Sequence, residues 1–155
     1  PEGLAEAMDI NKYAPAPAPA AAGEIGLQSG SFTPVELAAF LNTLPFDITF
    51  VDRNDKVKYF SEGKERIFLR TRAVIGREVR YCHPPQSLEA VERILTDLRE
   101  GKKDSYEFWI NMKGRLIHIR YFAVRDAAGA YLGTLEVTQD ITDIRKIQGE
   151  KRLAV

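Results

Sequence analysis

Cys82 and His83 are the side chains of this sequence whose chemistry best suits a bound iron, and they lie in the short segment Cys-His-Pro-Pro. Thiolate and imidazole are both good iron ligands, and the two prolines that follow restrict the backbone. Adjacent residues rarely bind one metal ion together, so at most one of the two would ligate the iron of a haem group, and His83 is the candidate. In the alternative interpretation Cys82 is a small buried side chain, and His83 with its prolines positions the start of a helix.

A set of polar and aromatic side chains on three predicted strands forms a second candidate site. Alternating residues of a strand point to opposite faces, so Ile117, Ile119 and Tyr121 share one face of the strand 116–124. We expect this face to line a small-molecule pocket. The predicted contact residues are His83, Trp109, Asn111, Tyr121, Glu136 and Thr138. Burial of Glu136 is costly unless the carboxylate is paired or protonated. In the alternative interpretation these groups only satisfy hydrogen bonds in the core or face solvent.

The other face of the predicted sheet is also apolar and must be covered. We expect it to carry Phe108, Ile110, Met112, Phe122, Leu135 and Val137. The helix predicted at 34–44 is the obvious cover, supplied either by the same chain or by a second copy. We therefore expect a homodimer.

The elements that must position these residues can be predicted from turns and periodicity. Thr33 is a good N-cap and Pro34 suits the first turn of a helix that ends before Pro45. A longer helix is predicted at 87–100, where apolar residues recur at helical spacing before Gly101. The predicted strands are 46–51, 57–60, 105–112, 116–124 and 131–141, with short helices or turns at 61–80 and a last helix at 142–153. This order predicts an α+β fold with one five-stranded antiparallel sheet.

Several segments resemble a known family in the right order and at the right distances. The turn Gly129–Gly133, the strand after it and Asp140-Ile141-Thr142 resemble the last hairpin and the "DIT" ending of PAS domains. The resemblance implies the PAS fold, with short helices on one face of the sheet and the N-terminal helix on the other. It also implies a sensory, ligand-binding role in which the segment after Thr142 transmits the signal.

A narrower resemblance is carried by residues 76–87, 114–126 and 135–142. These segments are similar to the C-terminal PAS-like domain of bacterial DUF438 proteins, which often carry a hemerythrin-like segment upstream. That resemblance implies such a segment as a partner within a longer parent protein. It does not name the ligand.

The chain divides by composition into three predicted parts. Residues 1–30 include the run Ala-Pro-Ala-Pro-Ala-Pro and several glycines, which is typical of a linker. Residues 31–145 form the predicted sensor domain, and residues 146–155 a C-terminal helix or tail. The first residue is Pro1 and no signal-peptide pattern follows, so we interpret the chain as a fragment.

The totals restrict the functions to be considered. Lys plus Arg and Asp plus Glu number 22 each, so no net charge attracts nucleic acid or an anionic membrane. The apolar runs are far shorter than the roughly 20 residues that span a bilayer. A single cysteine suits the cytoplasm. Two histidines and one cysteine are too few for a closed zinc site without carboxylates, so we expect no structural metal.

No catalytic motif is present, so we expect no enzyme activity. We expect a module that binds a small molecule and signals through flanking helices and dimerisation. The alternatives are a ligand-free dimerisation module and a haem-binding redox sensor.

Overall fold

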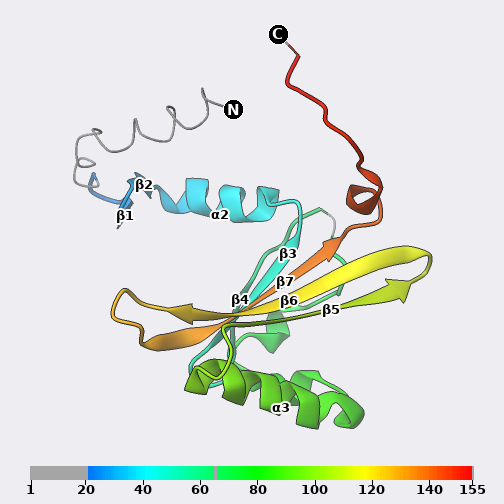
Figure 1. The fold of residues 1–155 in the computed structure, drawn as a ribbon. Coiled ribbons are helices and arrows are strands. Elements are labelled where there is room, and N and C mark those ends of the chain that lie inside the picture. Colours follow the sequence, from blue (N-terminus) through cyan, green and yellow to red (C-terminus); the bar gives the residue numbers. More distant parts are fainter. Residues whose placement is uncertain (1–20, 65, 155) are drawn as a thin grey trace. The chain divides into compact units, whose positions relative to one another are not determined.

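The computed structural model describes residues 21–64 and 66–154. It divides into two units, 1–41 and 42–155, which are described here one at a time. The first twenty residues of the predicted linker, including its Ala-Pro run, lie outside the described residues. Figure 1 gives the labels of the elements used below.

The described part of the first unit is a short hairpin followed by a helix. Strand β1 (Ile25–Leu27) pairs antiparallel with β2 (Gly30–Phe32), and α2 spans Pro34–Thr43. The N-terminus of α2 has a capping box, because the Glu36 amide donates to Thr33 Oγ1 and the Thr33 amide donates to Glu36 Oε1. The predicted helix is confirmed. The hairpin was not predicted, because the glycines around it indicated a linker.

The second unit is built on a five-stranded antiparallel sheet in the order β4-β3-β7-β6-β5 (Figure 1). Its strands are β3 (Asp47–Asp52), β4 (Val57–Phe60), β5 (Ser105–Met112), β6 (Arg115–Arg125) and β7 (Tyr131–Asp140). All five were predicted to within a few residues. The fold class, α+β with one antiparallel sheet, is therefore confirmed.

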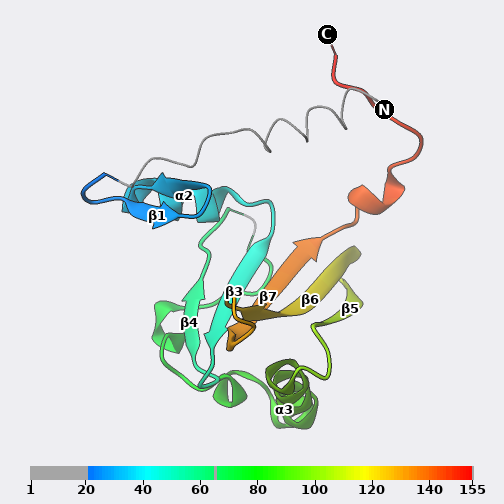
Figure 2. The ribbon, with the colours of Figure 1, turned by 60° about the vertical axis from the view of Figure 1, so that its left-hand side comes forward.

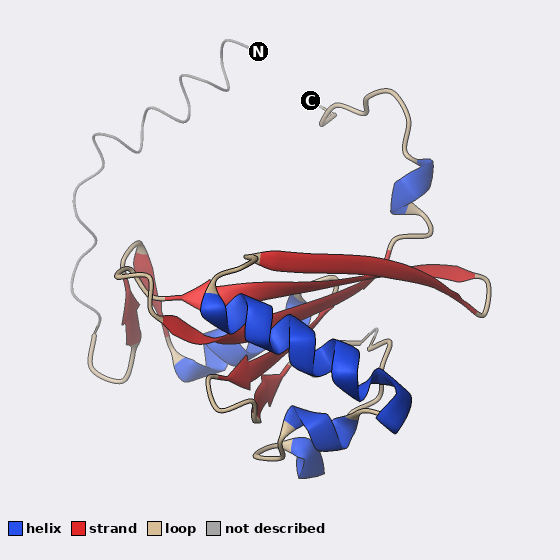
Figure 3. Ribbon diagram, turned by 60° about the horizontal axis from the view of Figure 1, so that its bottom comes forward, coloured by secondary structure: helices blue, strands red, loops and turns tan. Residues whose placement is uncertain are grey.

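Helices lie on one face of this sheet, as Figures 2 and 3 show. They are two short 3-10 helices, Arg72–Val74 and Val79–Cys82, and the long helix α3 (Pro85–Glu100). Helix α3 begins two residues earlier than predicted, because proline is tolerated in the first turn of a helix. Its apolar side packs onto the sheet through Leu95 and Leu98, both buried. Leu95 joins Val51, Val57 and Val79 in the core cluster. The predicted position of α2 over the opposite face stays a prediction.

The C-terminal segment differs from the prediction. Only Ile144–Lys146 forms a 3-10 turn, and residues 147–154 are neither helix nor strand. The two apolar side chains that suggested an amphipathic helix, Ile144 and Ile147, are exposed. A short helix in water depends on burial of its apolar face, and these side chains gain none here. The predicted helix at 142–153 was wrong.

Candidate functional site

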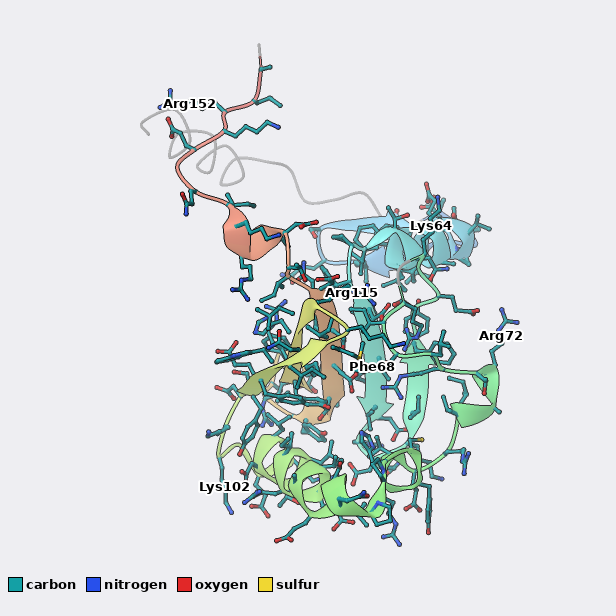
Figure 4. The ribbon with its side chains drawn as sticks, turned by 90° about the vertical axis from the view of Figure 1, so that its right-hand side faces the viewer. Lys64, Phe68, Arg72, Lys102, Arg115 and Arg152 are labelled. Carbon is teal, nitrogen blue, oxygen red and sulfur yellow. The ribbon has the colours of Figure 1, made fainter. Side chains whose placement is uncertain are left out.

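A half-open groove lies on the helix-covered face of the sheet, with a volume of about 410 Å³. Its apolar wall is formed by Phe68, Phe108, Ile110 and Ile119. In Figure 4 Phe68 lies beside the strands, whereas Arg72 points away from the sheet. A small inner cavity of about 20 Å³ extends toward α3 and shares three lining residues with the groove. The shared residues are His83, Tyr121 and Glu136.

The pairing of strands decides which predicted site residues reach this groove. Tyr121 pairs directly with Glu136, and Ile119 pairs with Thr138. Directly opposed residues of an antiparallel pair share a face. The structure therefore places Tyr121, Glu136 and Thr138 on one face, as predicted.

Trp109 and Asn111 lie on the opposite face, so the prediction that they share a face with Tyr121 was wrong. The two-residue turn after Met112 makes Met112 pair with Arg115. Continued along the two strands, this register places Trp109 opposite His118. Because the side-chain period of a strand is two, this register turns every odd-numbered residue of β5 away from the groove. Trp109 is 62% exposed there.

Glu136 forms an ion pair with Arg70 that the sequence did not reveal. Arg70 Nη2 lies 3.3 Å from Glu136 Oε1, and the two side chains are only 14% and 12% exposed. Thr138 Oγ1, which is buried, donates to the same carboxylate oxygen over 3.3 Å. The cost of burying Glu136 indicated that the carboxylate needs a partner. Arg70 could not be identified as that partner, because it lies in a segment without helix or strand, where the sequence has no periodicity from which side-chain directions can be predicted.

Arg70 Nε is buried and has no hydrogen-bond partner among the residues that the structure describes. An unsatisfied buried donor costs about 1–3 kcal/mol. Arg70 also lines the groove. Because Nε itself is buried, a molecule in the groove would meet other atoms of Arg70.

A second ion pair holds the segment that carries Arg70 against the sheet. Arg66 Nη1 lies 3.8 Å from Asp47 Oδ1, and the Ile67 amide donates to Asp47 Oδ2 over 2.6 Å. Burial raises the pKa of Asp47, while the Ile67 hydrogen bond and the Arg66 charge act in the opposite direction. Arg66 also donates to the Ser61 carbonyl. These contacts fix the approach of the 61–70 segment to β3.

Tyr121 and His83 add two more polar groups to the groove. Burial raises the pKa of the Tyr121 hydroxyl, and the charge and hydrogen bonding of Glu136 raise it further, so Tyr121 stays neutral. His83 Nδ1 lies 2.9 Å from the Val79 carbonyl oxygen, which can only accept. A neutral His83 therefore carries its proton on Nδ1 and keeps a lone pair on Nε2.

His83 fits a haem ligand only as a single imidazole. Among the described residues, no three His, Cys, Asp or Glu side chains gather as a metal site would require. Cys82 Sγ lies 3.9 Å from the Glu78 carbonyl, and Cys82 packs against the core cluster. Cys82 is half-buried, so it packs as the alternative interpretation expects without being fully enclosed. Within the same residues, none of the helices is long and apolar enough to span a bilayer.

The end of β7 is tied to β6 by the residues of the Asp140-Ile141-Thr142 segment. Asp140 Oδ1 accepts hydrogen bonds from the amide and the hydroxyl of Thr142, at 3.0 and 2.6 Å. The Leu116 amide donates to Thr142 Oγ1, and the Ile141 amide donates to the Leu116 carbonyl. These bonds fix the direction in which the chain leaves the sheet.

Comparison with known proteins agrees with this geometry. A family model described as PAS domain matches residues 37–142. A C-terminal domain from Streptococcus mutans is 32% identical, with a TM-score of 0.76, and the match covers 81% of this chain and 97% of that one. A PAS domain from Colwellia psychrerythraea is 18% identical, with a TM-score of 0.54, and covers 70% of this chain and 96% of that one.

Two more distant similarities are to proteins from Vibrio cholerae. A sensory box sensor histidine kinase has a TM-score of 0.50 at 14% identity, covering 70% of this chain and 91% of that one. VqmA bound to DPO has a TM-score of 0.51 at 19% identity, covering 71% and 58%. A search of curated protein sequences finds no significant match. The family model, which matches more than two thirds of the chain, establishes that this chain belongs to the PAS domain family.

Proposed function

We propose that the chain is a sensory PAS module that binds a small molecule in the groove between its sheet and the segment 68–84. The observation that carries the proposal is the Arg70–Glu136 ion pair, almost buried on the floor of an apolar groove. Apolar walls with a few convergent polar groups are typical of small-molecule sites. VqmA, which has a similar fold over 58% of its length, is bound to DPO, and this similarity supports a ligand-binding role.

The signal would leave through β7. Glu136 lines the groove and accepts a hydrogen bond from Thr138, and Asp140 at the end of the same strand holds Thr142. A ligand that prefers one arrangement of these side chains would shift the equilibrium between conformations of the joint after Asp140. The change would reach a following segment or a second copy of the chain.

We also propose a homodimer. Strand β5 is an edge strand, and Phe108, Trp109 and Ile110 on it are exposed. A long apolar edge strand is a ready site for pairing with another chain. The resemblance to DUF438 proteins adds a hemerythrin-like segment upstream as a proposed partner within the parent protein.

Native mass spectrometry of the purified chain, followed by its denatured mass and an absorption spectrum, tests the ligand proposal. We expect a retained small mass, and a higher melting temperature for the loaded protein. Tyr121→Phe should reduce the retained mass, whereas Trp109→Phe, on the opposite face, should not. A haem absorption band lost in His83→Ala would select the haem sensor. A colourless protein, without added mass and unresponsive to metabolite extracts, would refute the proposal and favour a dimerisation module.

A further inference from the structure

We propose that the groove takes an uncharged, flat molecule with an apolar ring and a hydrogen-bond donor at its edge, as an aromatic amide has. The inference rests on the proposed function, because it names the class of ligand for the same groove. Three features of the groove lead to it: its charge balance, its free acceptor position and its walls.

The first feature is that the fixed charges of the groove cancel. Arg70 and Glu136 are 3.3 Å apart and both are nearly buried. An anion that approached Arg70 would also face the Glu136 carboxylate, and a cation near Glu136 would face the guanidinium. Both charged classes also lose hydration on entering the groove. An uncharged molecule has neither cost.

The second feature is the hydrogen-bonding capacity that the Arg70–Glu136 pair leaves unused. Glu136 Oε1 accepts from Arg70 and Thr138, and Tyr121 also hydrogen-bonds to this side chain, but a carboxylate has about four acceptor positions. One can still receive an N–H or O–H group of the ligand. An acceptor position on Glu136 is complementary to the N–H group at an amide edge.

The third feature is the shape and composition of the walls. Phe68, Phe108 and Ile119 present apolar surface to the groove. The volume of about 410 Å³ is at the small end of ligand sites. Leu69 also lines the groove and is 93% exposed, so an apolar molecule in the groove would gain contact with it. A small aromatic or heterocyclic ring with a polar edge fits these walls.

Four probes of similar shape separate the ligand classes: benzamide, benzoate, benzamidinium and toluene. They are titrated at millimolar concentrations into the isotope-labelled full chain, and the amide signals of Tyr121, Glu136 and Thr138 are followed by NMR. We expect benzamide to shift these signals and to bind about tenfold or more tightly than each of the other three, because only benzamide offers Glu136 a hydrogen-bond donor without adding charge.

A double variant shows whether the ion pair sets this preference. Arg70→Met with Glu136→Met replaces the pair by apolar side chains of similar volume, a change that buried pairs often tolerate. The melting temperature checks that the variant is folded. Its preference should change from benzamide to toluene. The matched control, Arg72→Met with Glu62→Met, removes an exposed ion pair outside the groove and should leave the preference unchanged.

The other outcomes overturn the inference in distinguishable ways. Tighter binding of benzoate or benzamidinium would make the groove an ion site and leave the proposed function standing. Equal binding of toluene and benzamide would show that the groove selects only for apolar surface. If none of the probes shifted groove signals, the ligand class would be wrong, and the retained mass in native mass spectrometry would decide the proposed function separately.

Discussion

Replacing Gly133 with alanine tests how closely strands β3 and β7 approach beside the groove. A β-carbon at this position would lie 2.2 Å from the Val51 carbonyl oxygen and 2.7 Å from the Phe50 ring. The first neighbour is backbone and cannot rotate away. Residue 133 pairs with Asp52 of β3, so the clash would push the two central strands apart.

The expected loss of stability follows from two costs. Overpacking a well-packed site costs typically about 1–3 kcal/mol. The backbone of Gly133, with φ of 159°, adds a cost of order 1–3 kcal/mol for a residue with a side chain. The midpoint of the sum is about 4 kcal/mol, which is a large part of the roughly 5–15 kcal/mol that stabilises a domain. For a chain of this length the melting temperature should fall by about 8–16 °C.

The assay is thermal and urea unfolding followed by circular dichroism, with Gly129→Ala as the matched control. Gly129 also has positive φ, 84°, but nothing lies within 4 Å of the β-carbon it would gain. Alanine there should cost only the backbone term, about 1–2 kcal/mol. Equal losses in the two variants would refute the reasoning, because the close approach to Val51 would then contribute nothing.

Three further predictions concern the joint, the groove and the edge strand. Hydrogen bonds from Thr142 lower the pKa of Asp140, so the contribution of Asp140 to stability is present above the ordinary aspartate pKa and is lost as the pH falls through the lowered pKa. The urea-unfolding free energies of wild type and Asp140→Asn should therefore converge in acid. A difference that stays constant with pH would contradict this. Burial raises the pKa of Tyr121, so the free energy of unfolding should fall as the pH rises past the ordinary tyrosine pKa. Tyr121→Phe should remove the last step, at the highest pH, of an absorbance titration of the tyrosines. An unchanged titration would argue against burial. Trp109→Lys should lower the dimer fraction in sedimentation at equal concentration while groove binding persists; an unaltered dimer would place the interface elsewhere.

Local signals predicted most of the fold. The helix from Pro34 has its capping box in the residues that indicated it. All five strands follow from β-rich runs between polar turns, and their order matched that of PAS domains. The C-terminal helix failed for a physical reason, because its apolar residues have nothing to bury against in the described chain. A helical pattern of apolar residues predicts a helix only when another element covers that face.

The candidate site was harder to predict, because it depends on pairing between strands. Tyr121, Glu136 and Thr138 lie on adjacent strands in a register that places them on one face. Trp109 was assigned to the wrong face because one residue of register reverses every side chain of a strand. The turn Lys113-Gly114 contained the information needed, since a two-residue turn opposes Met112 and Arg115. Counting outward from that turn gives the observed face.

Arg70 marks the limit of such reasoning, and it is also the residue that gives the groove its chemistry. A buried Glu136 requires a partner, but a loop without periodicity does not say which of its cations reaches the carboxylate. Once Arg70 is placed, the pair links ligand and output along one strand. Glu136 is four residues from Asp140, about 13 Å along β7 at the usual rise of a strand. A molecule that reorganises the ion pair therefore acts directly on the strand that ends in the Asp140–Thr142 joint, and no longer chain of contacts is needed to carry a signal.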